Sequence, residues 1–146
     1  MDSSRVVGLL PRVFGLYLKR FEQRARALDC TLRQCDVLLC LAAHEGVSQS
    51  RLGQLINIDP MTLLRTLDSL ESQGNLERRH DPADRRTRRV YLTAKGKLLV
   101  DDIWRSVELT GLEAFAGIAD KHAALVIEIL EEMHRNFAAL PSACKH

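Results

Sequence analysis

The stretch DPADRRTRRVYLT, residues 81–93, ends in an alternation of apolar and polar residues around Val90 and Leu92. A weaker alternation, with Leu76 as its apolar residue, precedes it at residues 76–80. A period of two is typical of β-strands, and the Asp-Pro pair between the two runs favours a turn. The pattern therefore predicts a β-hairpin with a long, basic tip.

Positive charge is concentrated on this hairpin. The whole chain of 146 residues carries a net charge of only +2. Residues 78–89 hold six arginines against two aspartates, a local charge of +4, so the rest of the chain sums to −2. A focused basic patch on an otherwise slightly acidic chain indicates a polyanionic partner.

Helical periodicity dominates the rest of the chain. A first amphipathic helix is expected from its apolar face, which comprises Val7, Leu10, Phe14, Tyr17, Phe21 and Leu28. A second helix is expected after Thr31, a suitable N-cap, and should run to Gly46. Another helix should begin after Thr93, and the last carries an apolar seam of Val126, Leu130, Met133, Phe137 and Leu140.

Two short helices are expected between the second helix and the hairpin. Ser48 can cap the first, and Asp59 followed by Pro60 can begin the second, which should stop at Gly74. A helix-turn-helix followed by a basic hairpin has the order of a winged helix-turn-helix.

We therefore expect a mainly α fold with a small β-hairpin wing. Residues 32–93 would form the DNA-binding lobe, flanked by dimerisation helices at 5–30 and 94–140. The apolar stripes of the flanking helices exceed what one such lobe can cover, which predicts a homodimer.

Composition argues against several other classes of protein. Hydrophobic residues make up 46% and charged residues 27%, which is typical of a soluble globular protein. The early apolar run is broken by Pro11 and Arg12 and is too short to span a bilayer. The sequence shows no phosphate loop, nucleophile motif or set of metal ligands. We expect no enzyme activity, cofactor, metal or membrane association, and a cytoplasmic location with reduced cysteines.

The second short helix should bury Leu63, Leu67 and Leu70 on one face. The candidates for DNA contact lie opposite this face or on its flank and are Arg65, Ser69, Thr62 and Thr66. Arg65 can read a guanine edge or bind a phosphate, but it can also pair with Asp68. The two threonines can bind a phosphate, touch a thymine methyl group, or be plain helix surface.

Ser48 and Gln49 begin a helix whose free N–H groups suit a phosphate, although Ser48 can also be only a cap. In the hairpin, Arg85, Arg86 and Arg88 are the candidates for DNA contact. The planar guanidinium group suits a narrow, electronegative minor groove.

The hairpin resembles the wing of the MarR family of transcriptional regulators, whose motif is matched by Asp84, Arg86, Leu92 and Thr93. The stretch LLRTLDSLESQGNLERR, residues 63–79, is similar to the family's recognition helix and wing entry, and its RTLDSLE portion leans toward the branch named after SlyA. The resemblance extends from about residue 9 to residue 140. Arg51 and Met61 depart from the residue types common in the family.

This resemblance implies a homodimer joined through its terminal helices and acting as a repressor or activator at a near-palindromic operator. It also implies a small aromatic or phenolic effector, for which Tyr17 and Phe21 are candidate contacts or simply core residues. Asp84, which cannot favour phosphate, is expected to shape the wing by pairing with Arg86 or Arg88. A winged-helix adaptor that binds protein instead of DNA is the alternative function.

The four cysteines allow a redox-sensing interpretation, since one branch of the family senses hydroperoxides through a cysteine in its first helix. Here that helix has no cysteine unless it reaches Cys30. Cys40 is expected in the core, and the environment of Cys35 is left open by the sequence. We expect these thiols to be structural, because reactivity requires exposure and a lowered pKa.

Overall fold

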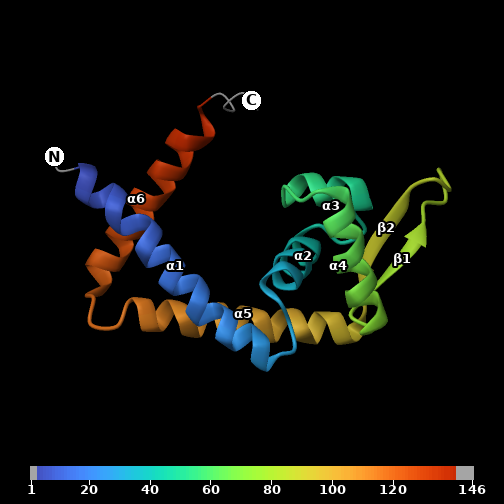
Figure 1. Ribbon diagram of the computed structural model, residues 1–146, viewed down its shortest axis with the longest axis horizontal. Coiled ribbons are helices and arrows are strands. Elements are labelled where there is room, and N and C mark those ends of the chain that lie inside the picture. Colours follow the sequence, from blue (N-terminus) through green and yellow to red (C-terminus); the bar gives the residue numbers. More distant parts are fainter. Residues whose placement is uncertain (1–2, 141–146) are drawn as a thin grey trace. The chain divides into compact units, whose positions relative to one another are not determined.

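The computed structural model describes residues 3–140, except for the Ser3 side chain. Within this range it contains eight helices and strands (Figure 1). In chain order these are α1 (Ser3–Ala27), α2 (Leu32–Ala43), α3 (Gln49–Leu55), α4 (Pro60–Ser72), β1 (Leu76–His80), β2 (Arg88–Leu92), α5 (Ala94–Ala114) and α6 (Asp120–Ala138). The chain forms two compact units, residues 1–110 and 111–146, and the last turn of α5 belongs to the second. The mainly helical fold with one antiparallel hairpin confirms the expected fold class.

Side-chain caps determine where the helices of the first unit begin. Thr31 Oγ1 accepts a hydrogen bond of 3.1 Å from the Gln34 N–H, and Gln34 Oε1 accepts one of 2.9 Å from the Thr31 N–H, which completes a capping box for α2. Cys30 and Cys35 flank this box at the positions of a hydrophobic staple. The predicted starts of α3 after Ser48, of α4 after Asp59 and of α5 after Thr93 are likewise confirmed.

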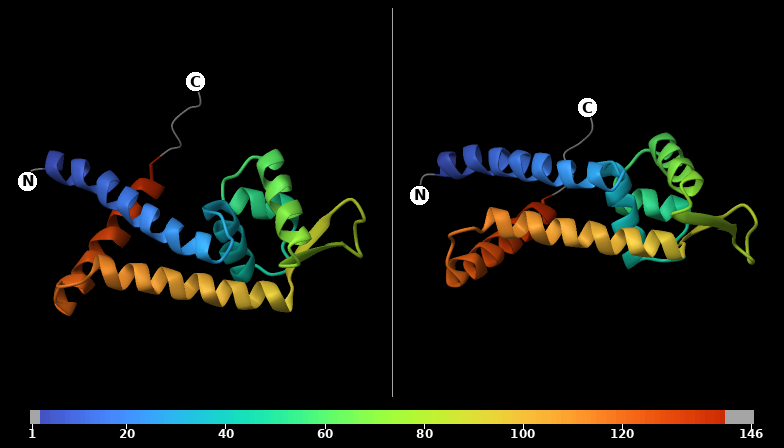
Figure 2. Two further views of the ribbon diagram at one scale, coloured as in Figure 1. Left: turned by 60° about the horizontal axis from the view of Figure 1, so that its bottom comes forward. Right: turned by 90° about the horizontal axis from the view of Figure 1, so that it is seen from below.

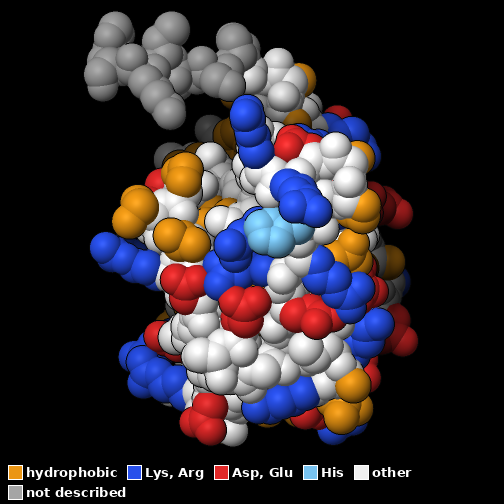
Figure 3. All heavy atoms as spheres, turned by 90° about the vertical axis from the view of Figure 1, so that its right-hand side faces the viewer, with side chains coloured by type: hydrophobic (Ala, Val, Ile, Leu, Met, Phe, Trp, Pro, Cys, Tyr) orange, Lys and Arg blue, Asp and Glu red, His pale blue; other side chains and the backbone are white. Residues whose placement is uncertain are grey.

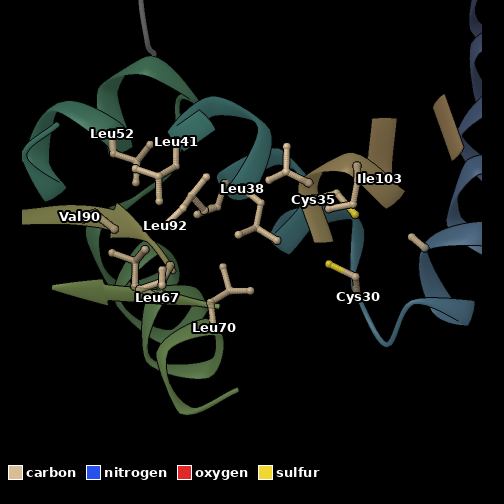
Figure 4. Packing of buried hydrophobic residues seen from close by; sticks show 14 of the residues in the cluster. Cys30, Cys35, Leu38, Leu41, Leu52, Leu67, Leu70, Val90, Leu92 and Ile103 are labelled. Atoms are coloured by element: carbon tan, nitrogen blue, oxygen red, sulfur yellow. The ribbon is translucent and has the colours of Figure 1, made fainter. Parts of the chain in front are cut away.

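The hydrophobic core of the first unit draws side chains from α2, α3, α4 and both strands, with further residues from α1 and α5 (Figure 4). Its fully buried side chains include Leu38, Leu41, Leu52, Leu67, Leu70 and Val90. Burial of Leu63, Leu67 and Leu70 confirms the face predicted for α4. Because a buried leucine or valine contributes about 1.5–3 kcal/mol relative to an exposed one, this cluster holds the helix-turn-helix and the hairpin together.

The hairpin is anchored by its inward residues and by the chain that enters α3. Leu76 pairs with Leu92 and Arg78 pairs with Val90 in the antiparallel register. The Gly46 N–H donates to the Val90 carbonyl at 2.9 Å, and the Val90 N–H donates to the carbonyl of Val47 at 3.0 Å. These bonds attach β2 to the start of the helix-turn-helix, and the hairpin tip projects beyond the lobe in both views of Figure 2.

The long terminal helices differ from the lobe in their burial. In α1 only Phe21 and Ala25 are buried among the described residues, whereas Phe14 is 60% exposed. The predicted stripe is therefore real but mostly uncovered in a single chain, and Leu28 lies just past the end of α1. In the second unit, α6 has no buried residue. The seam of α6 extends to Leu140, which follows the helix, while Cys144 and His146 lie outside the described residues.

Gly96 permits the first turn of α5 to approach the turn before β1. A Cβ atom at Gly96 would lie 1.9 Å from the carbonyl oxygen of Asn75 and 3.3 Å from a methyl carbon of Leu92. In the same turn, the Gly74 carbonyl accepts a hydrogen bond of 2.6 Å from the Thr93 hydroxyl. The lobe and α5 therefore join at a place with no room for a side chain.

We predict that Gly96→Ala lowers the free energy of unfolding by about 2 kcal/mol or more, because backbone must move to admit one methyl group. Gly111→Ala, in the same helix, is the control, since a Cβ there meets nothing within 4 Å. That control should unfold at the same free energy or up to about 1 kcal/mol higher. Urea titrations at one protein concentration measure both, and equal stabilities of the two variants would contradict the prediction.

Candidate nucleic-acid interface

A groove of about 770 Å³ separates the helix-turn-helix from the wing. Ser48 and Gln49 line it at the start of α3, Pro60 at the start of α4, and Arg86 and Arg88 on the hairpin. Three predicted parts of the interface are thus brought to one cleft. Figure 3 looks onto the end of the molecule that carries the hairpin, where Lys and Arg side chains are interspersed with Asp and Glu.

Three of the six clustered arginines, Arg78, Arg79 and Arg89, form ion pairs with acidic residues of the protein. Arg78 binds Glu71 and, at 2.7 Å, Asp68, with its side chain only 9% exposed. Arg79 pairs with Glu77 and lies 4.5 Å from the ring centroid of Tyr91. These contacts are internal to the lobe and the hairpin.

Arg89 joins the base of the wing to the helix-turn-helix. Its Nε donates to Asp81 at 2.7 Å and its terminal nitrogen donates to the Gly46 carbonyl at 2.8 Å. The Asp81 carboxylate also accepts the Ala83 N–H at 2.9 Å, and this bond together with Arg89 lowers the pKa of Asp81. The sequence pattern gave neither residue a structural role. The ion pair joins two residues of the hairpin, whereas the bond to Gly46 joins residues 43 positions apart.

Arg85, Arg86 and Arg88 are the arginines of the hairpin that stay available. All three are exposed, and within residues 3–140 no ion pair or hydrogen bond engages their guanidinium groups. Positive charge that the protein leaves uncompensated is therefore gathered at the wing tip, beside the groove.

Asp84 shapes that tip, but with different partners from those expected. Its carboxylate accepts the Arg86 backbone N–H at 3.0 Å and the Thr87 hydroxyl at 3.1 Å. The Thr87 N–H closes the turn on the Asp84 carbonyl at 2.9 Å. The expected pairing with an Arg86 or Arg88 guanidinium is absent from the described contacts, because the turn places backbone and hydroxyl donors on the carboxylate instead.

The exposed face of α4 differs from the predicted one. Thr66 is 9% exposed and its hydroxyl donates to the Thr62 carbonyl at 2.8 Å. Ser69 is half-buried and its hydroxyl accepts the Gln34 side-chain amide at 3.1 Å. The placement of Thr66 on an exposed flank was wrong, because Thr66 is buried beside the leucines of the core. Ser69 is half-buried like Thr62, so its contact with DNA stays a prediction.

Arg65 and Thr62 keep their predicted positions. Arg65 is exposed, and in the described part of the chain it has no pairing partner. The alternative pair with Asp68 does not form, because Asp68 binds Arg78. Thr62 is half-buried at the first turn of α4, where its N–H donates to Asp59 at 2.9 Å.

Ser48 and Gln49 are half-buried at the edge of the groove. The Ser48 hydroxyl accepts the Arg51 N–H at 3.2 Å, so it serves as the helix cap. This position is compatible with a role as helix cap and with a role in phosphate binding, because a cap at the edge of the groove still lies where a phosphate could approach.

Cys30, Cys35 and Cys40 lie in the core or against it. Cys30 and Cys35 are buried at the two positions of the staple (Figure 4), and the hydrogen bond between their thiols lowers the pKa of Cys30. That bond, followed by burial, raises the pKa of Cys35, and burial raises the pKa of the half-buried Cys40. These two thiols stay protonated at neutral pH. No cluster of potential metal ligands occurs among the residues that the structure describes.

The Arg78 ion pairs hold the wing against α4. The Arg78 backbone N–H donates to one Glu71 oxygen and Nε donates to the other, each at 3.0 Å. This bidentate contact lowers the pKa of Glu71. A carboxyl group with a lowered folded-state pKa stabilises the fold above its unfolded pKa, and that contribution is lost as the pH falls through the folded value.

We predict that Glu71→Gln lowers the free energy of unfolding at pH 7 by about 1 kcal/mol, a modest loss because the Glu71 side chain is 36% exposed. The difference from the parent should shrink as the pH falls below the ordinary pKa of a glutamate, about 4.3, and should disappear below the lowered folded-state pKa, where the parent carboxyl is protonated. Glu132→Gln, which removes an exposed partner of Arg135, is the control and should change stability by less than about 0.5 kcal/mol. A difference that persists unchanged to pH 3 would contradict the ionic origin.

Comparison with known proteins agrees with the geometry. The model of the MarR family matches residues 30–87. A MarR-family transcriptional regulator from Rhodococcus sp. RHA1 is 27% identical, with a TM-score of 0.76 over 91% of this chain and 94% of that one. CouR from Rhodococcus jostii RHA1, whose structure contains p-coumaroyl-CoA, is 27% identical, with a TM-score of 0.73 over 98% of this chain and 97% of that one.

BpsR of Bordetella bronchiseptica, whose DNA binding is regulated by 6-hydroxynicotinic acid, is also 27% identical, with a TM-score of 0.75 over 89% of this chain and 98% of that one. The fold and the groove define a winged helix-turn-helix protein. The family whose model matches its lobe, over residues 30–87, is the MarR family, and the similar structures include a MarR-family transcriptional regulator. Among the described residues, no helix combines the length and hydropathy needed to cross a membrane.

Proposed function

We propose that the protein is a homodimeric regulator of transcription that binds a near-palindromic operator in double-stranded DNA. The observation that carries the proposal is the uncompensated charge of Arg85, Arg86 and Arg88 beside a groove of about 770 Å³ that the start of α4 also lines. The match of the lobe to the model of the MarR family supports the same conclusion. No reaction is part of this function, because the family consists generally of non-enzymatic transcription factors.

Each part of the site has a role in this proposal. The start of α4 enters the major groove, where Arg65 can bind a guanine edge and Thr62 a phosphate. The wing arginines follow the neighbouring backbone or minor groove, where their charge displaces counterions. Ser48 and Gln49 lie where the strand between these two contacts would pass. The Arg78 and Arg89 contacts fix the wing relative to α4, which sets the distance between the two regions of contact.

Dimerisation explains the apolar surface of the terminal helices. In the first unit, Val7, Val13 and Phe14 of α1 are at least 60% exposed. In the second unit, Ile127 and Leu130 of α6 are 55% and 48% exposed. Apolar surface of this extent is typical of an obligate interface. Two lobes related by a two-fold axis would place their α4 helices about one DNA turn apart, roughly 34–36 Å.

A small effector is part of the proposed function. Both 6-hydroxynicotinic acid and the coumaroyl group are hydroxylated aromatic compounds, and they occur with two relatives of this chain. Phe21 is buried in the core, whereas Tyr17 of α1 is half-buried and remains a candidate contact. Within the family, the RTLDSLE stretch at residues 65–71 favours the SlyA-like branch.

We predict that Arg86→Ala weakens binding to operator and random duplexes alike and reduces the salt dependence, log Kd against log salt, by a slope of about one. Arg65→Ala should instead narrow the difference between operator and random DNA by roughly 1–3 kcal/mol if Arg65 makes a bidentate base contact. Arg105→Ala, which removes an exposed arginine paired with Asp102 on α5, is the charge-matched control and should change neither quantity.

Salt titrations of the three variants on both duplexes, followed by fluorescence anisotropy, measure these effects. Arg86→Ala with unchanged affinity and slope on every duplex would show that the hairpin is not a DNA wing. A winged-helix adaptor that binds protein would then be the better description.

We also predict that the parent sediments as a dimer at micromolar concentration, and that Leu130→Glu shifts it toward monomer. Glutamate keeps the helix propensity of leucine while placing a charge in the apolar seam. Glu128→Ala, an exposed change on the same helix, should leave the dimer intact. A stable parent monomer in sedimentation velocity would rule out the proposed assembly.

A further inference from the structure

Two large apolar side chains remain uncovered on the helix assigned to DNA. Met61 is 58% exposed and Leu64 is 37% exposed, both near the start of α4. With Arg65 and Asp68 they follow the spacing i, i+3, i+4 and i+7, which places them on one face of the helix. The opposite face is already filled by the buried leucines of the core, so these two side chains are not packing residues of this lobe.

The surroundings indicate what covers this face. Arg65 follows Leu64 directly and is exposed on the same face. Pro60, which precedes Met61, lines the groove together with Arg86 and Arg88. An apolar pair beside uncompensated arginines is poorly suited to a second basic lobe, because like charges would meet. It is well suited to a polyanion that displays apolar groups of its own.

The major groove of DNA displays one apolar group, the 5-methyl of thymine, among hydrogen-bonding edges. Neither methionine nor leucine has a side-chain hydrogen-bond donor, and the methionine sulfur is only a weak acceptor, so contact with that methyl group is their main means of distinguishing bases there. The threonine methyl of Thr66 is not available for this purpose, because Thr66 is buried.

Resting on the proposed DNA-binding function, we propose that Met61 and Leu64 are specificity-determining residues that read thymine methyl groups. The half-site then contains thymine where the start of α4 meets the bases, next to the position bound by Arg65. This assigns the apolar part of the recognition code to Met61, a residue that departs from the usual family type.

Replacement of thymine by deoxyuridine tests this assignment, since it removes only the methyl group and keeps every hydrogen-bonding atom. Duplexes bound by the full-length protein are first selected from a randomised library. Each thymine of the selected half-sites is then replaced in turn. One or two positions per half-site should lose about fourfold in affinity, which corresponds to about 0.8 kcal/mol for one buried methyl group.

Met61→Ala and Leu64→Ala should each bind the thymine duplex more weakly and lose the response to deoxyuridine at one of those positions. Leu98→Ala, which truncates a leucine 68% exposed on α5, is the matched control and should keep the full response. Thermal unfolding of all variants verifies that the lobe remains folded, as expected for changes at exposed positions.

The outcomes separate this inference from the proposed function. Failure to select any duplex overturns both. A selected duplex without a uracil-sensitive position, or with equal sensitivity for the parent and both variants, overturns the methyl reading and leaves DNA binding standing. Variants that respond like the parent to deoxyuridine but alter the oligomeric state of the free protein would assign this face to a protein interface instead.

Discussion

The ion pairs of Arg78 connect the two halves of the candidate interface. A single guanidinium, nearly excluded from solvent, bridges Glu71 and Asp68 of α4 from the first strand of the hairpin. It fixes the wing relative to the helix, and it also removes Asp68 as a partner for Arg65. One internal contact thus provides both the geometry of the site and the free charge on its helix. Loss of both carboxylates would leave the nearly buried guanidinium unpaired, which is costly, whereas loss of one partly exposed carboxylate has a modest effect.

The division of the hairpin arginines follows from the same principle. Arg78 and Arg89 meet carboxylates and a carbonyl, whereas Arg79 pairs with Glu77 of its own strand and its side chain is 61% exposed. Arg85, Arg86 and Arg88 extend beyond the reach of such partners, and the Asp84 carboxylate accepts bonds from the turn itself. A cluster that reads as six equivalent charges in the sequence is therefore divided into three arginines with internal partners and three whose guanidinium groups have none among the described residues. The last three carry the charge that the proposed polyanion would meet.

The apolar surfaces of the chain have correspondingly different meanings. The core leucines join α2, α3 and α4 with β2, whereas the stripes of α1 and α6 remain uncovered in one chain. Met61 and Leu64 form a third, small apolar surface on the face that carries Arg65. Burial against the lobe, against a second copy and against thymine methyl groups would use the same hydrophobic effect, and only position in the fold distinguishes them.

Much of this protein was determined by the sequence alone, because the signals are local. Thr31, Ser48, Asp59 and Thr93 each cap a helix through bonds to residues three positions away, and the alternation at Val90 and Leu92 defines a strand whichever fold it joins. The wing arginines 85, 86 and 88 were likewise predicted, since a turn tip is exposed in most contexts.

What only the tertiary structure decided is which polar groups find partners at a distance. Ser69 is engaged by the Gln34 side chain, 35 positions away, and no pattern within α4 reports that contact. Thr66 is different, because it lies at helical spacing from Leu63 and Leu70 and its burial follows from the same apolar stripe. Arg89 becomes a scaffold residue because it binds both Asp81 within the hairpin and the Gly46 carbonyl, 43 positions away. Such pairings depend on packing between elements, and packing is settled by the whole core and not by any one stretch of the chain.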